Sequence, residues 1–285
     1  MSLLPRRSGE SPEEQAKAAR FLVRQCGLTE QDVDRVLDLQ RTEELSFTEA
    51  ALRLGLASQS DVDSALARPE PLTAAADARP SEELLSVHDP FNPYTEQLRA
   101  LRQELLNRNP AEGGLCLAVV SAGPGEGRSR LAADLAIVLS QLEESTLLID
   151  ADFRRPRQHE LFGVPGDVGL AQALRSGSSP RVHRVEGLDH LAVMAAGAAP
   201  GNPMEMLTGK HCGELLQGLS RRYQHVVLDT PPTSQFSDGL AVANHAGAAV
   251  MLVREHRSEL KQCRELSRRL ASTRAQVLGA ALVPK

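Results

Sequence analysis

The sequence lacks an excess of positive charge, closely spaced cysteines and long apolar runs. Its 32 Lys and Arg residues stand against 37 Asp and Glu residues, and the net charge of −5 argues against a nucleic-acid-binding surface. None of the four cysteines forms a C-x-x-C pair, so we expect reduced thiols and no disulfide or metal site. No apolar run approaches the roughly 18 residues of a membrane span, and no apolar stretch follows Arg6 and Arg7 as in a signal peptide. These absences predict a cytoplasmic protein.

A Gly-rich segment follows a short apolar run near the middle of the chain. Residues 115–120 suit a buried strand, residues 123–127 hold three glycines, and a helical pattern begins near Arg128. This order of strand, Gly-rich loop and helix is that of a phosphate-binding P-loop. The glycines let backbone N–H groups approach a phosphate closely, and the helix N-terminus adds a partial positive charge. We therefore expect a phosphate site here.

The segment departs from the P-loop consensus G-x-x-x-x-G-K-[ST] at two positions. Ala122 replaces the first glycine and Arg128 replaces the lysine, whereas Gly127 and Ser129 match. Arg can bind phosphate through two N–H groups, but its planar guanidinium is bulkier than an ammonium group. An ordinary Gly-rich turn between a strand and a helix is the alternative interpretation.

Acidic residues end two further apolar segments that are typical of buried strands. Asp150 ends the first and is followed by Asp152, whereas Asp229 ends the second, in the sequence QHVVLDTPP. A carboxylate at the C-terminal end of a strand beside a P-loop can hold Mg²⁺ or accept a proton. Strand patterns at 247–253 and 276–283, with helical patterns between, predict an α/β fold with a doubly wound, mostly parallel sheet.

The chain divides by its sequence pattern into three regions. Residues 12–68 are predicted to form a small all-helical domain, because a helical pattern around Asp32 recurs around Asp61. We interpret this domain as a docking module. Residues 69–93 contain five prolines and are predicted to be a linker. Residues 94–285 then form the P-loop domain, which a chain of 285 residues can accommodate beside a small second domain.

A helical pattern at the start of the third region carries charged residues at intervals of three. Glu96, Arg99 and Arg102 would lie along one face of that helix. Such a stripe is in general more typical of a solvent-exposed face than of an interface, so the pattern alone favours a solvated helix.

Several motifs together resemble those of a known family. GPGEGRS, LLIDADFRRP and VVLDTPP are similar to the Walker A, Walker A′ and Walker B motifs of the bacterial tyrosine kinases of capsule and exopolysaccharide synthesis, which are deviant-Walker P-loop ATPases. The segments GLAQAL (169–174) and AAGAAPGNPMEML (195–207) resemble further parts of that family. The resemblance covers residues 88–283 and is closest to the chain-length-determinant branch.

The resemblance implies an ATP-dependent protein tyrosine kinase, an autokinase that acts with Mg²⁺ and regulates exopolysaccharide chain length and export. It implies that Arg128, Asp150 and Asp152 are catalytic. It also implies that Ser129, Asp150 and Asp229 hold Mg²⁺. The loop residues that would contact ATP are Gly123, Gly125, Glu126, Gly127, Arg128, Ser129 and Arg130.

The same resemblance suggests partners. Glu96, Arg99 and Arg102 match a motif that joins neighbouring subunits of a ring in the family, so we now interpret them as an oligomer interface. A membrane polysaccharide copolymerase is the expected partner, which would bring this cytoplasmic protein to the inner membrane without a span of its own. The N-terminal module resembles the helical domain of secretion ATPases, and docking to a partner is its expected role.

Two other features differ from the family and leave alternatives open. Val283 stands where the family has an Asn, and the Tyr-rich tail is missing, so the tyrosines are Tyr94, expected to be a flexible phosphate acceptor, and Tyr223, expected to be packed. A catalytically weak nucleotide-binding regulator is the alternative function, and a partition-type ATPase is a weaker third. If Arg128 slows the reaction, Arg128→Lys should raise turnover with little change in affinity.

Overall fold

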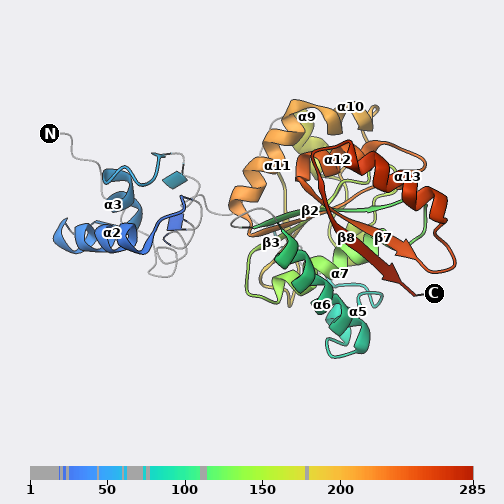
Figure 1. Cartoon of the computed structure of the whole chain (residues 1–285), viewed down its shortest axis with the longest axis horizontal. Helices are drawn as coiled ribbons and strands as arrows, with labels where there is room; N and C mark the ends of the chain where they lie inside the picture. Colours follow the sequence, from blue (N-terminus) through green and yellow to red (C-terminus); the bar gives the residue numbers. More distant parts are fainter. Residues whose placement is uncertain are drawn as a thin grey trace. The chain divides into compact units, whose positions relative to one another are not determined.

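The chain contains two compact units. The structure, a computed structural model, describes residues 19, 22–23, 26–43, 45–59, 61–62, 73–74, 78–109, 114–176 and 180–284. One unit lies within residues 1–69 and the other within residues 70–285 (Figure 1). Within the described part of the chain, no helix is long and apolar enough to cross a bilayer.

The first unit is helical, as its sequence pattern predicts. Helix α2 spans Glu30–Glu43 and helix α3 spans Phe47–Arg53. Their apolar faces close over a small core that includes Val36, Phe47 and Ala51. Because each helix alone would leave an apolar face in water, the two stabilise each other by burying these side chains.

The sequence repeat of the first unit corresponds to the same kind of helix N-terminus, formed twice. Thr29 N–H donates to Asp32 Oδ2 at 3.2 Å, and Asp32 N–H donates to Thr29 Oγ1 at 3.3 Å. Ser58 and Asp61 form the same reciprocal pair, at 2.8 and 3.2 Å. Such a pair satisfies N–H groups that no helical carbonyl can reach. Helix capping therefore explains why this Asp recurs in the sequence.

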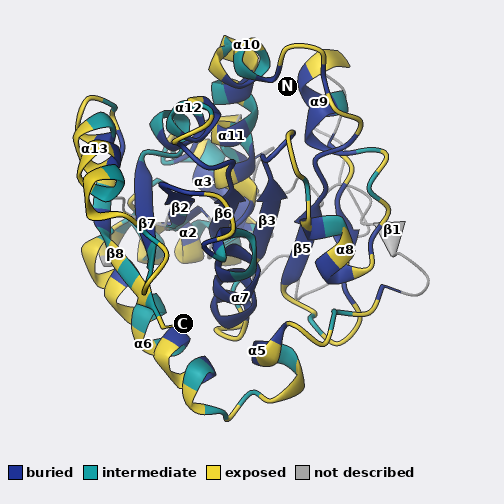
Figure 2. Cartoon of the chain, turned by 90° about the vertical axis from the view of Figure 1, so that its right-hand side faces the viewer, coloured by how far each residue is buried: buried dark blue, intermediate teal, exposed yellow. Residues whose placement is uncertain are grey.

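The second unit is built on an eight-stranded sheet in the order β1-β4-β5-β3-β6-β2-β7-β8. Figure 2 shows the strands from β5 through β3, β6, β2 and β7 to β8 side by side. Every neighbouring pair is parallel except β4 and β5. The strands are β1 (Thr73–Ala74), β2 (Leu115–Ser121), β3 (Thr146–Asp150), β4 (His183–Arg184), β5 (Leu191–Met194), β6 (His225–Asp229), β7 (Ala248–Arg254) and β8 (Gln276–Val283). The strands expected from apolar runs are β2, β3, β6, β7 and β8, and the mostly parallel α/β sheet is confirmed.

Helices cover both faces of this sheet, because alternate strand residues point to opposite sides. On β2, Leu117 and Val119 pack in one core with α5 to α8, whereas Ala118 and Val120 pack in the other with α9 to α13. The helices are α5 (Leu85–His88), α6 (Pro93–Arg108), α7 (Arg128–Ser140), α8 (Gln158–Phe162), α9 (Leu170–Ser176), α10 (Pro203–Thr208), α11 (Lys210–Arg222), α12 (Asp238–Ala246) and α13 (Leu260–Ala271). Two helical layers therefore enclose the sheet, as in doubly wound folds.

The segment expected to be a linker, residues 69–93, is packed where the structure describes it. Ala78 and Leu84 are buried in the same core as α7 and α8, and Ser81 N–H donates to the Leu161 carbonyl at 2.8 Å. The prolines suggested an extended chain, but the apolar residues between them favour burial. The structure thus differs from the linker prediction over residues 78–93.

Candidate functional site

The Gly-rich loop joins β2 to α7 through two glycines with positive φ. Gly125 has a φ of +68°, and Gly127, which precedes α7, has a φ of +101°. A side chain would be strained at either position, and a Cβ at Gly125 would lie 2.5 Å from Nη2 of Arg257. The N-terminal N–H groups of α7 and the helix dipole favour an anion at this loop. The strand, loop and helix predicted from the sequence are therefore present.

The loop also contains a contact that the sequence pattern did not indicate. Gly123 N–H donates to Oε2 of Glu126 at 3.0 Å, and Glu126 is buried. Gly123 was expected to contact the nucleotide, but its N–H is used within the loop.

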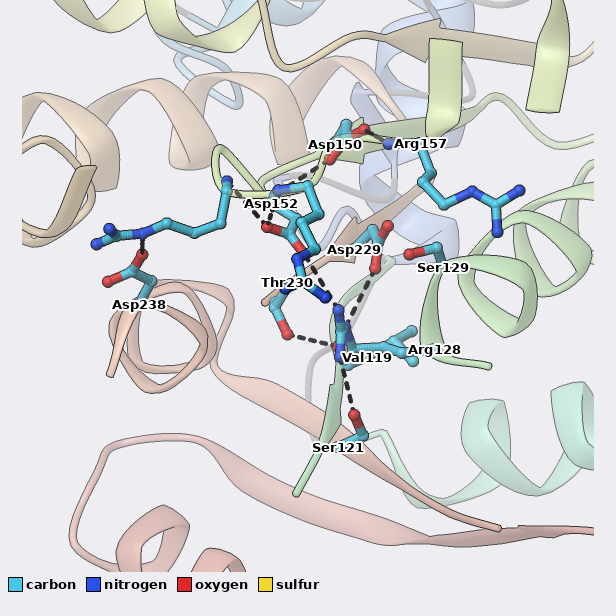
Figure 3. A network of polar contacts seen from close by, with 12 residues as sticks. Val119, Ser121, Arg128, Ser129, Asp150, Asp152, Arg157, Asp229, Thr230 and Asp238 are labelled. Carbon is cyan, nitrogen blue, oxygen red and sulfur yellow. Dashed lines mark hydrogen bonds and ion pairs between the residues drawn. The ribbon is translucent and has the colours of Figure 1, made fainter. Parts of the chain in front are cut away.

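The guanidinium of Arg128 lies between two carboxylates (Figure 3). Nη2 donates to Asp152 Oδ2 at 3.1 Å, Nε lies 3.4 Å from Asp229 Oδ1, and Nη1 donates to Ser121 Oγ at 2.9 Å. Only 8% of the Arg128 side chain is exposed. Arg128 was expected to reach the phosphates, whereas in the structure it holds together the two carboxylates that follow β3 and end β6.

Asp150 and Asp229 end the neighbouring strands β3 and β6 at the same level of the sheet, and both are fully buried. Asp150 Oδ2 accepts the N–H groups of Arg157 and Gln158, both at 2.9 Å, and Oδ1 accepts the N–H of Asp152 at 3.1 Å. Burial and the Asp229 carboxylate raise the pKa of Asp150 well above its usual value, although these N–H groups oppose the rise. Asp150 therefore fixes the shape of the loop after β3.

One carboxylate oxygen of Asp229 makes no hydrogen bond to the described residues. Oδ2 accepts the side-chain N–H of Gln158 at 2.8 Å, whereas Oδ1 is buried and only faces Nε of Arg128. Gln158 also donates to the Ser129 carbonyl at 2.9 Å, and Ser129 lies beside Asp229 (Figure 3). Burial raises the pKa of Asp229, while Arg128 opposes the rise. A buried carboxylate oxygen beside a serine hydroxyl fits a Mg²⁺ ion.

Protein side chains alone would not complete such a metal site. Among the described residues, no group of three or more His, Cys, Asp or Glu side chains could hold a metal ion. Mg²⁺ at Asp229 would therefore also need the Ser129 hydroxyl, water and phosphate oxygens, a ligand set that Mg²⁺ commonly takes. Asp150, the other expected metal ligand, has both oxygens in hydrogen bonds to backbone N–H groups.

Two further contacts join distant parts of the chain, and no sequence pattern predicted them. One is the hydrogen bond from Gln158 to Asp229, 71 residues apart in the chain. In the other, 84 residues apart, Arg154 Nε donates to Asp238 Oδ2 at 3.0 Å, and its guanidinium lies 4.2 Å from the centroid of the Phe236 ring. Both join the chain between the end of β3 and the start of α8 to the end of β6 or the start of α12. No local pattern distinguishes such a Gln or Arg from surface residues.

The charged face of α6 packs partly on α7. Arg99 pairs with Glu96 within the helix and donates from Nε to Gln141 Oε1 at 3.2 Å. Arg102 donates to the carbonyl of Val138. The Glu96 side chain is 59% exposed. Both arginines therefore have contacts within the chain, and the Glu96 carboxylate, although paired with Arg99, stays exposed enough to bind a partner as well.

Tyr94 lies in the first turn of α6 and not in a flexible segment. Its OH donates to the buried Asp134 at 2.8 Å, and the guanidinium of Arg130 lies 5.2 Å from the ring centroid. Burial raises the pKa of Tyr94. Arg130, expected at the nucleotide, thus contacts Tyr94 and Asp134. Tyr223 is buried, which confirms its packing role.

Comparison with known proteins identifies relatives of this chain. No protein-family model matches the sequence. The chain is 31% identical to the tyrosine-protein kinase YwqD of Bacillus subtilis over 204 residues, which cover 71% of this chain and 86% of that protein. It is 30% identical to the putative tyrosine-protein kinase CapB of Staphylococcus aureus, over 70% of this chain and 88% of the relative. Some relatives are longer: the match spans 26% of the putative tyrosine-protein kinase EpsB of Ralstonia nicotianae, at 34% identity.

Solved structures that resemble this chain include kinases as well. The chimerical protein CapA2B2 has a TM-score of 0.67 at 27% identity, over 80% of this chain and 100% of that one. The kinase domain of the Escherichia coli tyrosine kinase ETK has a TM-score of 0.66 at 29% identity, over 71% and 80%. MinD of Pyrococcus horikoshii, solved with Mg-ADP, shares the fold with a TM-score of 0.50 at 17% identity, over 58% and 68%. The chain therefore belongs to the family of bacterial tyrosine-protein kinases.

Proposed function

We propose that this chain transfers phosphate from ATP to tyrosine and acts in exopolysaccharide synthesis. The observation that carries the proposal is the convergence of Asp150, Asp152 and Asp229 beside the Gly-rich loop. Phosphoryl transfer depends on positioning and on charge neutralisation, with little covalent chemistry for the protein to perform. Charged groups for both purposes meet here, and the relatives are named tyrosine-protein kinases. This favours a kinase over a regulator with weak catalysis.

The loop is proposed to hold the phosphates of Mg-ATP. Its contacts would come from the N–H groups of Gly125, Glu126, Gly127 and Arg128, supported by the positive φ of both glycines and by the start of α7. Ser129 and Asp229 would hold Mg²⁺, which neutralises charge on the phosphates when bound. Oδ1 of Asp229, which accepts no hydrogen bond from the described residues and lies 3.4 Å from Nε of Arg128, supports this assignment.

Asp150 is proposed to accept the proton of the tyrosine hydroxyl, with Asp152 assisting. A general base needs a pKa near the working pH, and burial beside Asp229 raises the pKa of Asp150. Arg128 holds the carboxylates of Asp152 and Asp229 in place, so that the charged groups keep a fixed geometry.

A phosphotransfer assay tests this function. The purified protein is incubated with radiolabelled Mg-ATP, with and without its membrane partner, and phosphotyrosine is mapped by mass spectrometry. We expect most label on the partner, because Tyr94 is bonded to Asp134 and Tyr223 is buried. Label on neither protein would contradict the proposed kinase activity. Label only on Tyr94 would contradict the expectation that its hydrogen bond to Asp134 prevents phosphorylation.

The partners are proposed from the family resemblance. A membrane polysaccharide copolymerase would bring this chain to the cytoplasmic face of the inner membrane, and the N-terminal helical unit would dock a partner. The triplet Glu96, Arg99 and Arg102 would join subunits of a ring. The exposed Glu96 carboxylate supports the last proposal, since an Arg of a neighbouring subunit could bind it.

We expect Glu96→Ala to convert oligomers into monomers, because the interface would lose a charge-assisted hydrogen bond in every copy of a symmetric assembly. Light scattering coupled to size-exclusion chromatography measures the mass. Glu104→Ala is a matched control, since Glu104 is equally exposed on α6 and pairs only with Arg108 of the same helix among the described residues. An equal mass for wild type and Glu96→Ala would contradict the interface.

A further inference from the structure

A buried carboxylate lies within the Gly-rich loop itself. Glu126 is 2% exposed and sits between the two glycines with positive φ, Gly125 and Gly127. Both of its oxygens are used: Oε2 accepts Gly123 N–H at 3.0 Å, and Oε1 accepts the Ser258 hydroxyl at 2.5 Å. A buried carboxylate is costly unless it is hydrogen-bonded, and here both of these hydrogen-bond donors are neutral.

Ser258 belongs to residues 254–258, which run from the last residue of β7 toward α13 and which we call the strap. Its hydroxyl oxygen accepts the N–H of Arg254 at 2.8 Å, so one chain of hydrogen bonds runs from the strap through Glu126 to Gly123. The strap touches the loop again through its arginines. Arg254 Nη1 lies 3.5 Å from the carbonyl oxygen of Gly125, and Arg257 Nε lies 3.3 Å from that of Pro124.

The glycines of the loop leave room for these contacts. A Cβ at Gly123 would lie 3.2 Å from Oε1 of Glu126, and a Cβ at Gly125 would lie 2.5 Å from Nη2 of Arg257. Because these glycines have no side chains, both the strap and a phosphate can approach the loop closely. The arginines also bring positive charge to the backbone of the loop, at the carbonyls of Gly125 and Pro124, which favours an anion there.

We propose that Glu126 is a positioning residue, which Ser258 holds so that the loop keeps its phosphate-binding shape. Its carboxylate accepts the hydrogen bond of the Gly123 N–H and so fixes the start of the loop. The backbone N–H groups from Gly125 onward then stay free to bind the phosphates. A loop already held in its binding conformation loses less entropy when it binds. This inference rests on the proposed binding of nucleotide, and it assigns a role to a side chain where the family resemblance used only a backbone N–H.

Ser258→Ala tests the proposal, because it removes the hydroxyl and leaves the Glu126 carboxylate with one hydrogen bond fewer. We expect the Kd for Mg-ADP, measured by calorimetry, to rise about tenfold. Turnover at saturating ATP should change less than about twofold, since Ser258 touches none of the proposed catalytic groups. Ser258→Thr keeps a hydroxyl and should restore affinity. Ser272→Ala is the control, because that hydroxyl donates to a carbonyl of α13 near the other end of the helix.

A second measurement uses the wild type and needs no variant to fold. The Gly123 amide should exchange slowly with solvent even without nucleotide, because Glu126 accepts its hydrogen bond. Fast exchange would overturn the proposal, as would equal affinities of wild type and Ser258→Ala. Failure of Ser258→Thr to restore affinity would also overturn it. A wild-type protein that binds no Mg-ADP would instead overturn the proposed function.

Discussion

Arg128→Ala is expected to lower the free energy of unfolding by about 3–5 kcal/mol, the usual effect of removing one partner from a buried ion pair. The guanidinium contacts Asp152 at 3.1 Å and Asp229 at 3.4 Å, and both carboxylates are almost completely buried. Without it, these two carboxylates would stay buried close to Asp150, with no cation of the described residues in contact with them. Urea unfolding followed by circular dichroism measures the change.

The control for this variant is Arg268→Ala. Arg268 forms an ion pair with Glu265 on the surface of α13 and is 75% exposed, so its loss should lower stability by less than about 1 kcal/mol. Equal stability of the Arg128 and Arg268 variants would show that Arg128 does not hold the acidic cluster together.

Arg128→Lys should behave as an intermediate case. An ammonium on a flexible chain cannot replace the planar group that reaches Asp152, Asp229 and Ser121 at once. We therefore expect lower stability and lower turnover. This reverses the expectation from the P-loop consensus, which treated Arg128 only as a ligand of phosphate. Faster turnover by the Lys variant would restore that first interpretation.

Asp229→Asn is expected to lower turnover by at least about 100-fold, since an amide oxygen holds Mg²⁺ more weakly than a carboxylate. The amide has the size of the carboxylate and can accept the hydrogen bond from Gln158. We therefore expect the fold to persist. Initial rates at saturating Mg-ATP, with a range of Mg²⁺ concentrations, separate lost metal affinity from lost chemistry.

Thermal unfolding of the same variant provides the structural control. Because the pKa of Asp229 is raised, its ionised form costs stability at neutral pH, and the cost disappears at pH values below its ordinary pKa. We therefore expect Asp229→Asn to melt no earlier than wild type at neutral pH. Asp189→Asn, in an exposed turn before β5, should leave rate and melting unchanged. Wild-type turnover by Asp229→Asn would remove Asp229 from the metal site.

The sequence by itself determined five of the eight strands of the second unit and the edge of the sheet where the site lies. Apolar runs predicted five strands, and the acidic residues at the ends of two of them lie beside the Gly-rich loop, as parallel strands require. The glycines also predicted the position of the loop between β2 and α7, where Gly125 and Gly127 have positive φ. These features depend on near neighbours in the chain, so local patterns are sufficient to reveal them.

Tertiary structure alone decided which groups meet within that edge. Glu126 and Ser258 are 132 residues apart, and Gln158 and Asp229 are 71 apart, so no local pattern links them. The direction of the Arg128 side chain was equally hidden, because a phosphate and a pair of carboxylates both attract a guanidinium. The strand order brings Asp150 next to Asp229. Burial then makes the ionised carboxylates unfavourable unless a cation such as the guanidinium of Arg128 lies close to them. Long-range packing therefore determines which groups the side chains of the loop contact, whereas the local sequence determines where the loop lies in the chain.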